Sequence, residues 1–232
     1  MYTIHHTAHV HDVDLNNRMS PGSVMRLLHI CADTQMRADS PSLEAVRDMG
    51  IAMIMNRLTM HFLKPIDRGD ELEVSTWPCE AAGFVLPRNY EIRRGGELIT
   101  QAESTWALVD LATRKLLRCD SIDLSRYVYG ERQEFRYDAV PRGAELEDAG
   151  TFPVLYEFCD LNRHMNNTRY LDMLCDFVPG IEDRTLKRLT IHYRNEAPFG
   201  STIRVQRGCT DDTFFFRTSI DGKANVDAVL VF

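Results

Sequence analysis

The 232-residue sequence has no apolar stretch that approaches the roughly 20 residues of a membrane-spanning helix. It begins without a basic segment followed by an apolar run, so the pattern of a secretory signal is missing. Its six cysteines are scattered without a Cys-x-x-Cys pair, which is typical of reduced thiols in a chain of this size. We therefore expect a cytoplasmic protein with no membrane span.

Positive charge is also scarce, because 27 Lys and Arg residues face 34 Asp and Glu residues and the net charge is −7. This balance argues against a general nucleic-acid binder, since phosphate contacts need clustered cations. Three short basic groups are interpreted first as solvated turns and strand edges, and they gain a role only if the partner is a small acidic protein. They are Arg93 with Arg94, Arg114 with Lys115 and Arg118, and Arg184 with Lys187 and Arg188.

What the sequence does contain is a faint internal duplication. The segment Asp14–Ser20 reads DLNNRMS and returns 146 residues later, from position 14 to position 160, as DLNRHMN. A second pair, RLTMHF at Arg57 and RLTIHY at Arg188, is offset by 131 residues, from position 57 to position 188. The smaller second offset places about 15 extra residues in the first copy, and similarity in a fixed order indicates two copies of one unit.

Each copy predicts a helix after the matched segment. Ser20 is a candidate N-cap with Pro21 at the first helical position. Apolar residues follow at helical spacing, at Val24, Leu27, Leu28 and Cys31, and their equivalents in the second copy are Tyr170, Met173, Leu174 and Phe177. Asn166 takes the place of the Ser20 cap, so a second core-facing helix of similar length is expected.

The remaining segments favour antiparallel strands. A strand is expected over 3–11, a short helix over 40–50, and strands over 58–63, 71–77, 85–93 and 98–109, with a hairpin turn over 94–97. An amphipathic helix must bury its apolar face, and a curved antiparallel sheet can cover it. The sequence thus predicts an α+β fold with an N-terminal repeat at 1–130, a polar linker at 131–150 and a C-terminal repeat at 151–232.

Only the second copy keeps residues suited to acid–base chemistry. His164 stands where the first copy has Arg18, and Glu196 stands where it has Pro65. Asp160, Asn162 and His164 alternate, so in an extended segment they point to one side. Each alone has a structural explanation, as a turn residue, a surface histidine or a strand-end charge. Together, and replaced in the first copy, they favour a catalytic site.

Other chemistry-bearing residues carry less weight. The histidines His5, His6, His9 and His11 are explained by an exposed strand, since no second cluster of ligands accompanies them, so we expect no metal and no cofactor. Cys159 adjoins Asp160, but alternation turns it to the other side, so we interpret it as structural.

The run Asp160–Tyr170 resembles the D-x-N-x-H-x-N-N-x-x-Y motif of the acyl-acyl carrier protein (ACP) thioesterases, and Tyr193–Ala197 is similar to their Y-R-x-E-C segment. Ser104–Asp110 is similar to the end of their first repeat. The resemblance implies a tandem hotdog fold, with two helix-wrapped antiparallel sheets joined as an intrachain pseudo-dimer. Ala197 replaces the family's cysteine, which excludes a thiolate there and favours a water-based mechanism. The plant members' transit segment is missing, which fits a bacterial cytosolic enzyme.

The resemblance implies hydrolysis of fatty acyl-ACP and four catalytic positions: Asp160, Asn162, His164 and Glu196. Our hypothesis for their roles is that His164 and Glu196 activate a water. Asn162 would hold the thioester carbonyl, Asp160 would orient its neighbours, and backbone N–H groups at the start of the second helix would add oxyanion stabilisation.

The resemblance also implies an acyl pocket in the first repeat, where Met53 and Met55 are candidates for its lining, although plain core is the commoner role of such residues. Asn167 is a candidate for substrate binding or for a structural contact. The expected partners are ACP and a fatty acyl chain, and a monomer and a homodimer both stay open. Alternatives are an acyl-coenzyme A thioesterase, a non-enzymatic acyl-binding module and, with no matching motif, a hotdog dehydratase.

Overall fold

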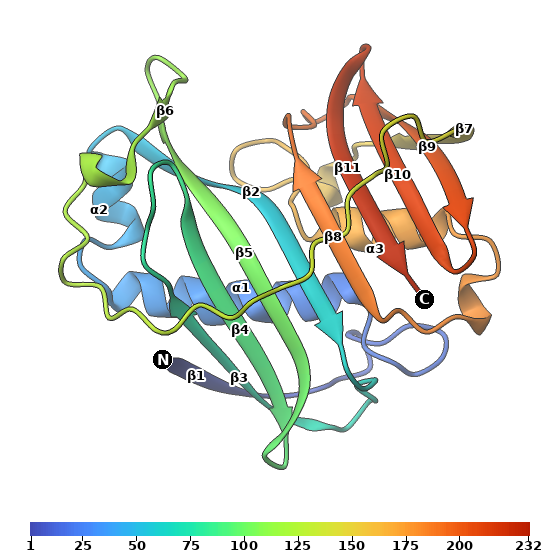
Figure 1. Ribbon diagram of the computed structural model, residues 1–232, viewed down its shortest axis with the longest axis horizontal. Coiled ribbons are helices and arrows are strands. Elements are labelled where there is room, and N and C mark those ends of the chain that lie inside the picture. Colours follow the sequence, from blue (N-terminus) through green and yellow to red (C-terminus); the bar gives the residue numbers. More distant parts are fainter.

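The computed structural model describes all 232 residues and forms one continuous 11-stranded antiparallel sheet with its helices on one face (Figure 1). The strands are β1 (Tyr2–Thr7), β2 (Ile51–Phe62), β3 (Glu71–Pro78), β4 (Leu86–Arg94), β5 (Glu97–Asp110), β6 (Leu116–Leu117), β7 (Glu147–Pro153), β8 (Arg188–Tyr193), β9 (Thr202–Thr210), β10 (Thr213–Ile220) and β11 (Lys223–Val231). Their order is β1-β3-β4-β5-β2-β8-β11-β10-β9-β7, with β6 paired to β5. The helices are α1 (Pro21–Ala38), α2 (Leu43–Asp48) and α3 (Arg169–Asp176). None of them is long and apolar enough to span a membrane.

Helix α1 begins where the sequence predicts. The Ser20 hydroxyl accepts the N–H of Ser23, Pro21 opens the first turn, and the four apolar positions predicted for the core are buried. The short helix expected over 40–50 is confirmed as α2, and its N-cap is Ser42. It ends before Gly50, whose φ of +77° favours glycine. These elements account for most of the extra residues of the first copy.

The second helix is shorter than expected. Helix α3 has only 8 residues, and Phe177, predicted as its last core position, is the C-cap residue. Pro179 and then Gly180, at φ +64°, prevent the chain from continuing the helix. Asn166 is not the N-cap: its side-chain oxygen accepts the N–H and hydroxyl of Thr168, in the turn that precedes Arg169. The expectation of two equally long helices was wrong.

The two copies join through β2 and β8. Thr59 pairs with Thr190 at the centre of this ladder, and their hydroxyl oxygens lie 3.3 Å apart. On either side Arg57 pairs with His192 and His61 pairs with Arg188, so equivalent residues exchange places across a pseudo-two-fold axis. The α1 and α3 apolar faces then share one core. The helices approach closely at Gly22, whose N–H donates to Asp172 Oδ1 at 2.8 Å where any side chain would clash.

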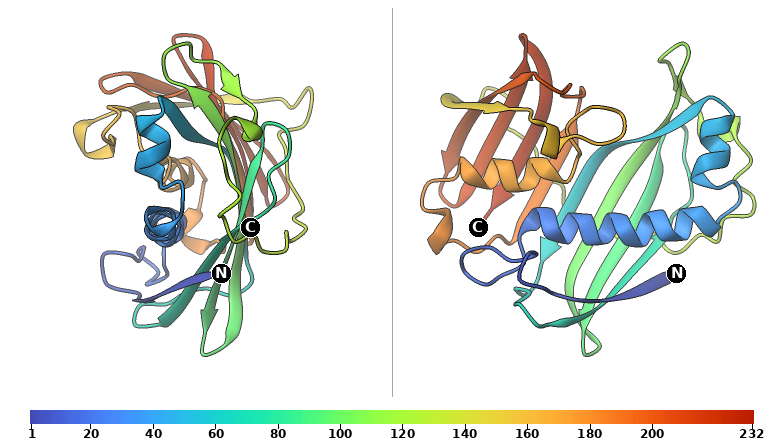
Figure 2. Two further views of the ribbon diagram at one scale, coloured as in Figure 1. Left: turned by 90° about the vertical axis from the view of Figure 1, so that its left-hand side faces the viewer. Right: turned by 180° about the vertical axis from the view of Figure 1, so that it is seen from behind.

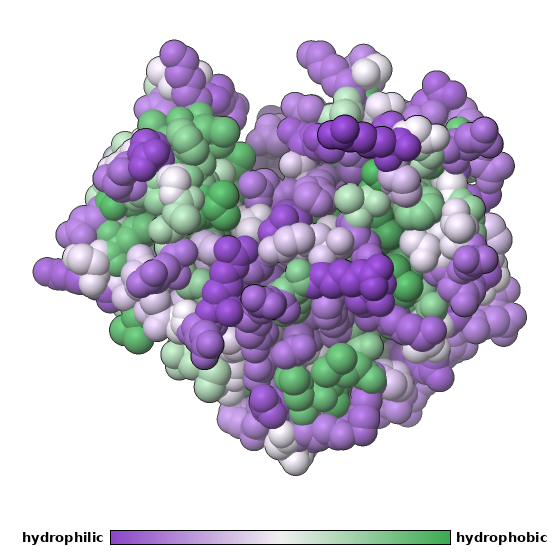
Figure 3. Space-filling model, viewed as in Figure 1, coloured by the Kyte–Doolittle hydropathy of each residue, from purple (hydrophilic) through white to green (hydrophobic).

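The segment between the copies crosses the sheet on the face opposite the helices (Figures 1 and 2). The strand β7 begins at Glu147, inside the segment 131–150 that the sequence assigned to the linker. Most of the linker is held by polar contacts. Trp77 Nε1 donates to the Glu131 carbonyl at 2.8 Å, and the Asp138 N–H donates to Thr190 Oγ1 at 3.2 Å. This explains why the segment lacks periodic apolar residues, and the outer face is accordingly mostly hydrophilic with separate hydrophobic patches (Figure 3).

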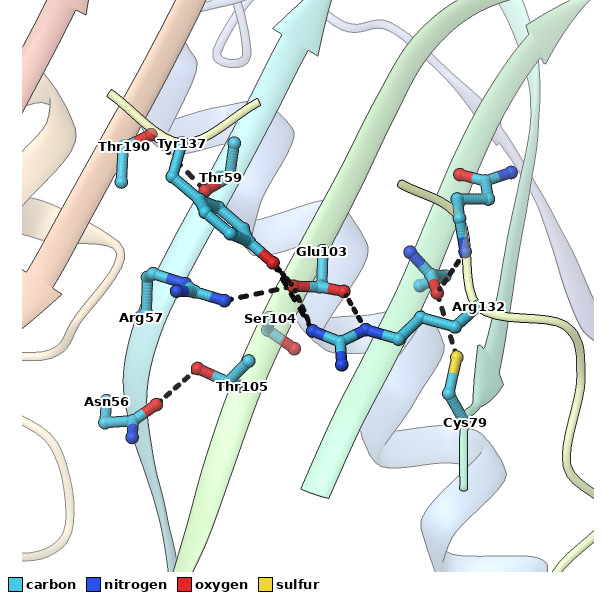
Figure 4. A network of polar contacts seen from close by, with 12 residues as sticks. Asn56, Arg57, Thr59, Cys79, Glu103, Ser104, Thr105, Arg132, Tyr137 and Thr190 are labelled. Carbon is cyan, nitrogen blue, oxygen red and sulfur yellow. Dashed lines mark hydrogen bonds and ion pairs between the residues drawn. The ribbon is translucent and has the colours of Figure 1, made fainter. Parts of the chain in front are cut away.

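A buried carboxylate anchors the start of the linker (Figure 4). Glu103 on β5 is only 1% exposed. Its oxygens accept from Arg132 Nε at 2.7 Å and from Arg57 Nη2 at 3.2 Å. The Arg57 guanidinium also lies over the ring of Tyr137, 3.8 Å from its centroid. The side chains of Arg57, Arg132 and the linker residue Tyr137 therefore surround the Glu103 carboxylate.

Candidate active site

The matched segments Asp14–Ser20 and Asp160–Asn166, hereafter the first-copy loop and the second-copy loop, fold alike. Asp14 Oδ1 accepts the N–H groups of Asn16 at 2.8 Å and Arg18 at 3.1 Å. Asp160 Oδ1 accepts those of Asn162 at 2.8 Å and His164 at 3.5 Å. The fourth residue has a left-handed φ in both loops, 61° at Asn17 and 63° at Arg163. The duplication is thus visible in individual hydrogen bonds, and the loops differ only in side chains.

The second-copy loop is a tight turn and not an extended segment. Because Arg163 adopts a positive φ, the chain reverses and the Asp160 carboxylate faces its own loop. The argument that Asp160, Asn162 and His164 alternate to one side was therefore wrong. Asp160 instead holds the main-chain N–H groups of the other two, which fixes the direction of their side chains. The side-chain amide of Asn162 is exposed and has no hydrogen-bond partner in the protein.

The structure brings His164 and Glu196 together, with 3.4 Å between His164 Nε2 and Glu196 Oε2. The second-copy loop docks against the segment after β8, where the Met165 N–H donates to the Ala197 carbonyl at 2.8 Å and the Phe199 N–H donates to the Arg163 carbonyl at 2.9 Å. The side chains of His164 and Glu196 are 25% and 56% exposed, so a water or substrate can reach both. Ala197 is fully buried.

A buried polar network supports the backbone around this pair. Asn225 on β11 donates through Nδ2 to Tyr170 Oη at 3.1 Å and to the Asn195 carbonyl at 2.5 Å, and it accepts from Thr218 Oγ1 at 2.9 Å. Tyr193 Oη donates to the Asn167 carbonyl at 2.9 Å. Burial raises the pKa of Tyr170 to about 12 and that of Tyr193 well above its usual value, so both phenols stay neutral.

Sequence reasoning missed Asn225. The only available signal was one of several polar residues in the strand, which also carries Lys223 and Asp227, and such a residue is not distinctive without its partners. Asn167 contributes a backbone carbonyl to this network, which gives it the structural contact that the sequence left as one of two options.

The two methionines that are candidates for the lining of the acyl pocket lie in different surroundings. Met53 on β2 lines a cavity of about 30 Å³ between α1 and the sheet, whereas Met55 is 5% exposed and packs in the main core. Arg88, only 4% exposed, forms a polar wall of this cavity and donates from Nη1 to Gln35 Oε1 at 2.6 Å. The cavity has room for the end of a chain or one water. The second-copy loop projects toward β2, the strand that carries Met53 (Figures 1 and 2).

The buried histidine His29 tests how α1 packs against the sheet. Its ring lies 6.1 Å from that of Trp106, its Nε2 is buried without a partner, and burial lowers its pKa to about 4. Unfolded, it would take a proton below about pH 6.5. Stability should therefore fall as the pH drops from about 6.5 to about 4, by on the order of 3 kcal/mol from this residue. Chemical denaturation at several pH values should show a shallower loss for His29→Leu than for the wild type. Parallel curves would contradict this account.

No set of three His, Cys, Asp or Glu side chains lies close enough to hold a metal ion. Near the N-terminus His6 Nε2 contacts Asp12 Oδ2 at 3.1 Å, the His6 and His9 rings meet edge to face, and the His9 and His11 rings stack. The Cys159 thiol donates to the Leu155 carbonyl at 3.4 Å. These contacts give the residues structural partners.

Solved structures with this architecture define its fold class. An acyl-ACP thioesterase from Bacteroides thetaiotaomicron superposes with a TM-score of 0.88 at 20% identity, covering 99% of this chain and 96% of that one. The 12:0-ACP thioesterase from Umbellularia californica gives 0.79 at 17% identity over 99% of this chain and 96% of its own. The fold is therefore the tandem hotdog, which confirms the expectation from the sequence.

Sequence comparison is more specific. Residues 1–124 match the acyl-ACP thioesterase N-terminal domain and residues 144–229 match the acyl-ACP thioesterase C-terminal domain. The chain belongs to the acyl-ACP thioesterase family.

Curated plant relatives agree with this assignment. The chloroplastic acyl-acyl-carrier-protein hydrolase FATB3 of Cuphea viscosissima is 30% identical over 149 residues, which is 58% of this chain and 35% of that protein. The chloroplastic palmitoyl-acyl carrier protein thioesterase of Arabidopsis thaliana is 28% identical over 154 residues, 59% of this chain and 36% of its own. The matched region thus spans about a third of each of these relatives.

Proposed function

We propose that this protein hydrolyses the thioester of fatty acyl-ACP to free fatty acid and ACP. The observation that carries the proposal is the contact between His164 in the second-copy loop and Glu196 after β8, at places where the first copy has Arg18 and Pro65. Membership of the acyl-ACP thioesterase family supports the substrate class. Binding an alkyl chain does not require an imidazole beside a carboxylate, so the pair favours an enzyme over a binding module.

In the proposed reaction, a water held between His164 and Glu196 attacks the thioester carbonyl carbon. Glu196 accepts the water's proton while the carbonyl oxygen gains negative charge. The exposed Asn162 amide is free to donate to that oxygen, whereas the first N–H groups at the start of α3 are occupied by Asn166. The C–S bond then breaks, and the proton passes to the departing sulfur of the carrier's prosthetic group. Asp160 acts through the loop backbone as a positioning residue.

The basic groups first considered for carrier docking are largely neutralised. Arg93 contacts Glu91, Arg94 contacts Asp70, Arg118 contacts Asp120, Arg184 contacts Asp212 and Arg188 contacts Asp138. Closer to the site, Arg163 in the second-copy loop is exposed and has no side-chain partner, and Arg169 opens α3 and contacts only the Glu157 carbonyl. We include Arg163 and Arg169 in the proposed docking surface for the acidic carrier.

The experiment that tests the proposal compares thiol release from acyl-ACP and acyl-coenzyme A esters of matched chain length. We expect kcat/KM for the carrier substrate to be at least about tenfold higher and to fall with rising salt, because salt screens the contacts between Arg163, Arg169 and the acidic carrier. Arg163→Gln should weaken only the carrier reaction, with the exposed Arg68→Gln as the matched control.

Each other outcome selects an alternative. Equal or faster coenzyme A turnover, insensitive to salt, would replace the proposal with a general acyl thioesterase. No hydrolysis of either ester, with retained acyl-chain binding, would favour a binding module. The cytoplasmic location expected from the sequence stays a prediction.

A further inference from the structure

A cavity of about 580 Å³ lies beside the first-copy loop, and the hydrolytic mechanism does not use it. It is lined by the first-copy loop and the start of α1, by residues 62–66 at the end of β2 and beyond it, by α3 and by 181–187. We call it the first-copy cavity. The two loops lie on opposite sides of the α1–α3 pair, so this cavity is remote from His164 and Glu196 (Figures 1 and 2).

The internal duplication shows which part of the second copy is equivalent to this cavity. Arg18 occupies the place of His164, and Pro65 occupies the place of Glu196. The docking contact is also repeated, since the Met19 N–H donates to the Ile66 carbonyl at 2.7 Å. The first-copy cavity is therefore the counterpart of the reacting site, with a permanent cation in place of the acid–base pair.

The charges in the cavity leave this cation available. Arg18 Nη1 donates to Thr185 Oγ1 at 2.8 Å and has no carboxylate partner. Lys187 Nζ donates to a main-chain oxygen of Phe232, the last residue of the sequence, at 3.0 Å.

The acids of the cavity are mostly occupied. Asp14 accepts from its own loop, Asp12 contacts His6, and Asp172 accepts from Gly22 and Arg26. Burial and the neighbouring Asp172 raise the pKa of Asp176, and both Asp176 and Glu182 are exposed to solvent.

The remaining walls are mixed, and the apolar side chains that they contribute include Met19, Val24, Phe62, Ile66, Cys175 and Leu186, all buried or half-buried. The volume falls within the 300–1,000 Å³ that is typical of sites for small molecules. Apolar side chains beside a guanidinium without a carboxylate partner fit a ligand with an alkyl chain and a carboxylate, because Arg binds carboxylates with two parallel N–H groups.

We propose that the first-copy cavity binds a free fatty acid, with the carboxylate on Arg18 and the chain against Met19, Val24 and Ile66. The choice of ligand rests on the proposed function, since a fatty acid is the product of that reaction. Arg18 and Pro65 stand where the reacting site has His164 and Glu196, so the bound molecule is held and not transformed. A product that binds here acts at a distance from the reacting site.

The test uses photoreactive fatty acids, namely diazirine-labelled octanoate, dodecanoate and hexadecanoate, with the intact protein. Mass spectrometry should locate label on peptides from the first-copy loop and α3. Arg18→Gln should lower affinity at this site by about tenfold or more, because it removes a charge-assisted contact. Arg18→Lys should restore part of the affinity. Arg68→Gln changes a nearby exposed cation outside the cavity and should have no effect.

Inhibition kinetics give a second readout. Added fatty acid should inhibit the wild type in a mixed pattern and Arg18→Gln in a purely competitive one. Label confined to the second-copy loop and the Met53 cavity, unchanged in Arg18→Gln, would overturn the inference. Thermal melts show whether Arg18→Gln is folded. If the protein binds fatty acid at two sites but hydrolyses no acyl-ACP, the proposed function fails and this inference stands. If it hydrolyses acyl-ACP but binds fatty acid at one site only, this inference fails and the proposed function stands.

Discussion

Replacing Glu196 with glutamine is expected to lower the rate of acyl-ACP hydrolysis by about a hundredfold to ten-thousandfold, the usual contribution of a general base. The amide cannot accept a proton from water, yet it has nearly the shape of the carboxylate. Because Glu196 is 56% exposed and contributes only a surface contact to His164, the fold should be unaffected. Single-turnover thiol release from acyl-ACP measures the effect without interference from product release.

The duplication supplies a matched control for this experiment. Pro65 occupies the equivalent position of the first copy, so Pro65→Ala changes the same point of the fold without touching the acid–base pair. We expect Pro65→Ala to retain turnover and His164→Ala to lose it about as fully as Glu196→Gln, since both residues act on one water. Retained hydrolysis in both second-copy variants would refute the assigned mechanism.

Glu103→Ala is expected to lower the free energy of unfolding by about 3–5 kcal/mol, the range for breaking a buried ion pair from one side. The carboxylate is 1% exposed and receives Arg57 and Arg132, so its removal leaves cations without a partner. The loss includes the anchor of the linker, because Arg132 and Tyr137 then have no acceptor there. Urea denaturation followed by fluorescence should show the shift in midpoint.

The control for this variant is Glu97→Ala. Glu97 lies on β5, as Glu103 does, and forms an exposed ion pair with Lys64. Surface pairs contribute little, so the unfolding midpoint should hardly move. A double variant, Glu103→Ala with Arg132→Met, should recover part of the loss, since one unpaired cation is removed with its partner. A Glu103→Ala midpoint equal to that of Glu97→Ala would contradict the buried-anchor account.

The fold could be predicted where local signals agree. Helix α1 has a cap, a proline at its first position and apolar residues at helical spacing, and all three act on the same residues. Strand β2 was recognised only from Leu58, although it begins at Ile51. A β-bulge between Met55 and Arg57 shifts the register there and interrupts the period of two.

The candidate site was predictable in part. Comparing the two copies singled out His164 and Glu196, which the structure places in contact. The turn geometry was not predictable, because nothing in the residue type of Arg163 announces a positive φ. The same holds for Asn225, whose partners Tyr170 and Asn195 come from distant segments. Contacts of this kind are decided by tertiary packing.

The β2–β8 ladder joins two units within one polypeptide, where a symmetric dimer would join two identical chains. In a symmetric dimer every substitution occurs twice, so a change that suits one site is imposed on the other. Fusion of two units in one gene removes that constraint. The first unit can therefore carry Arg18 and Pro65 while the second carries His164 and Glu196. One encoded chain can thereby divide its two ancestral sites between separate tasks under independent selection.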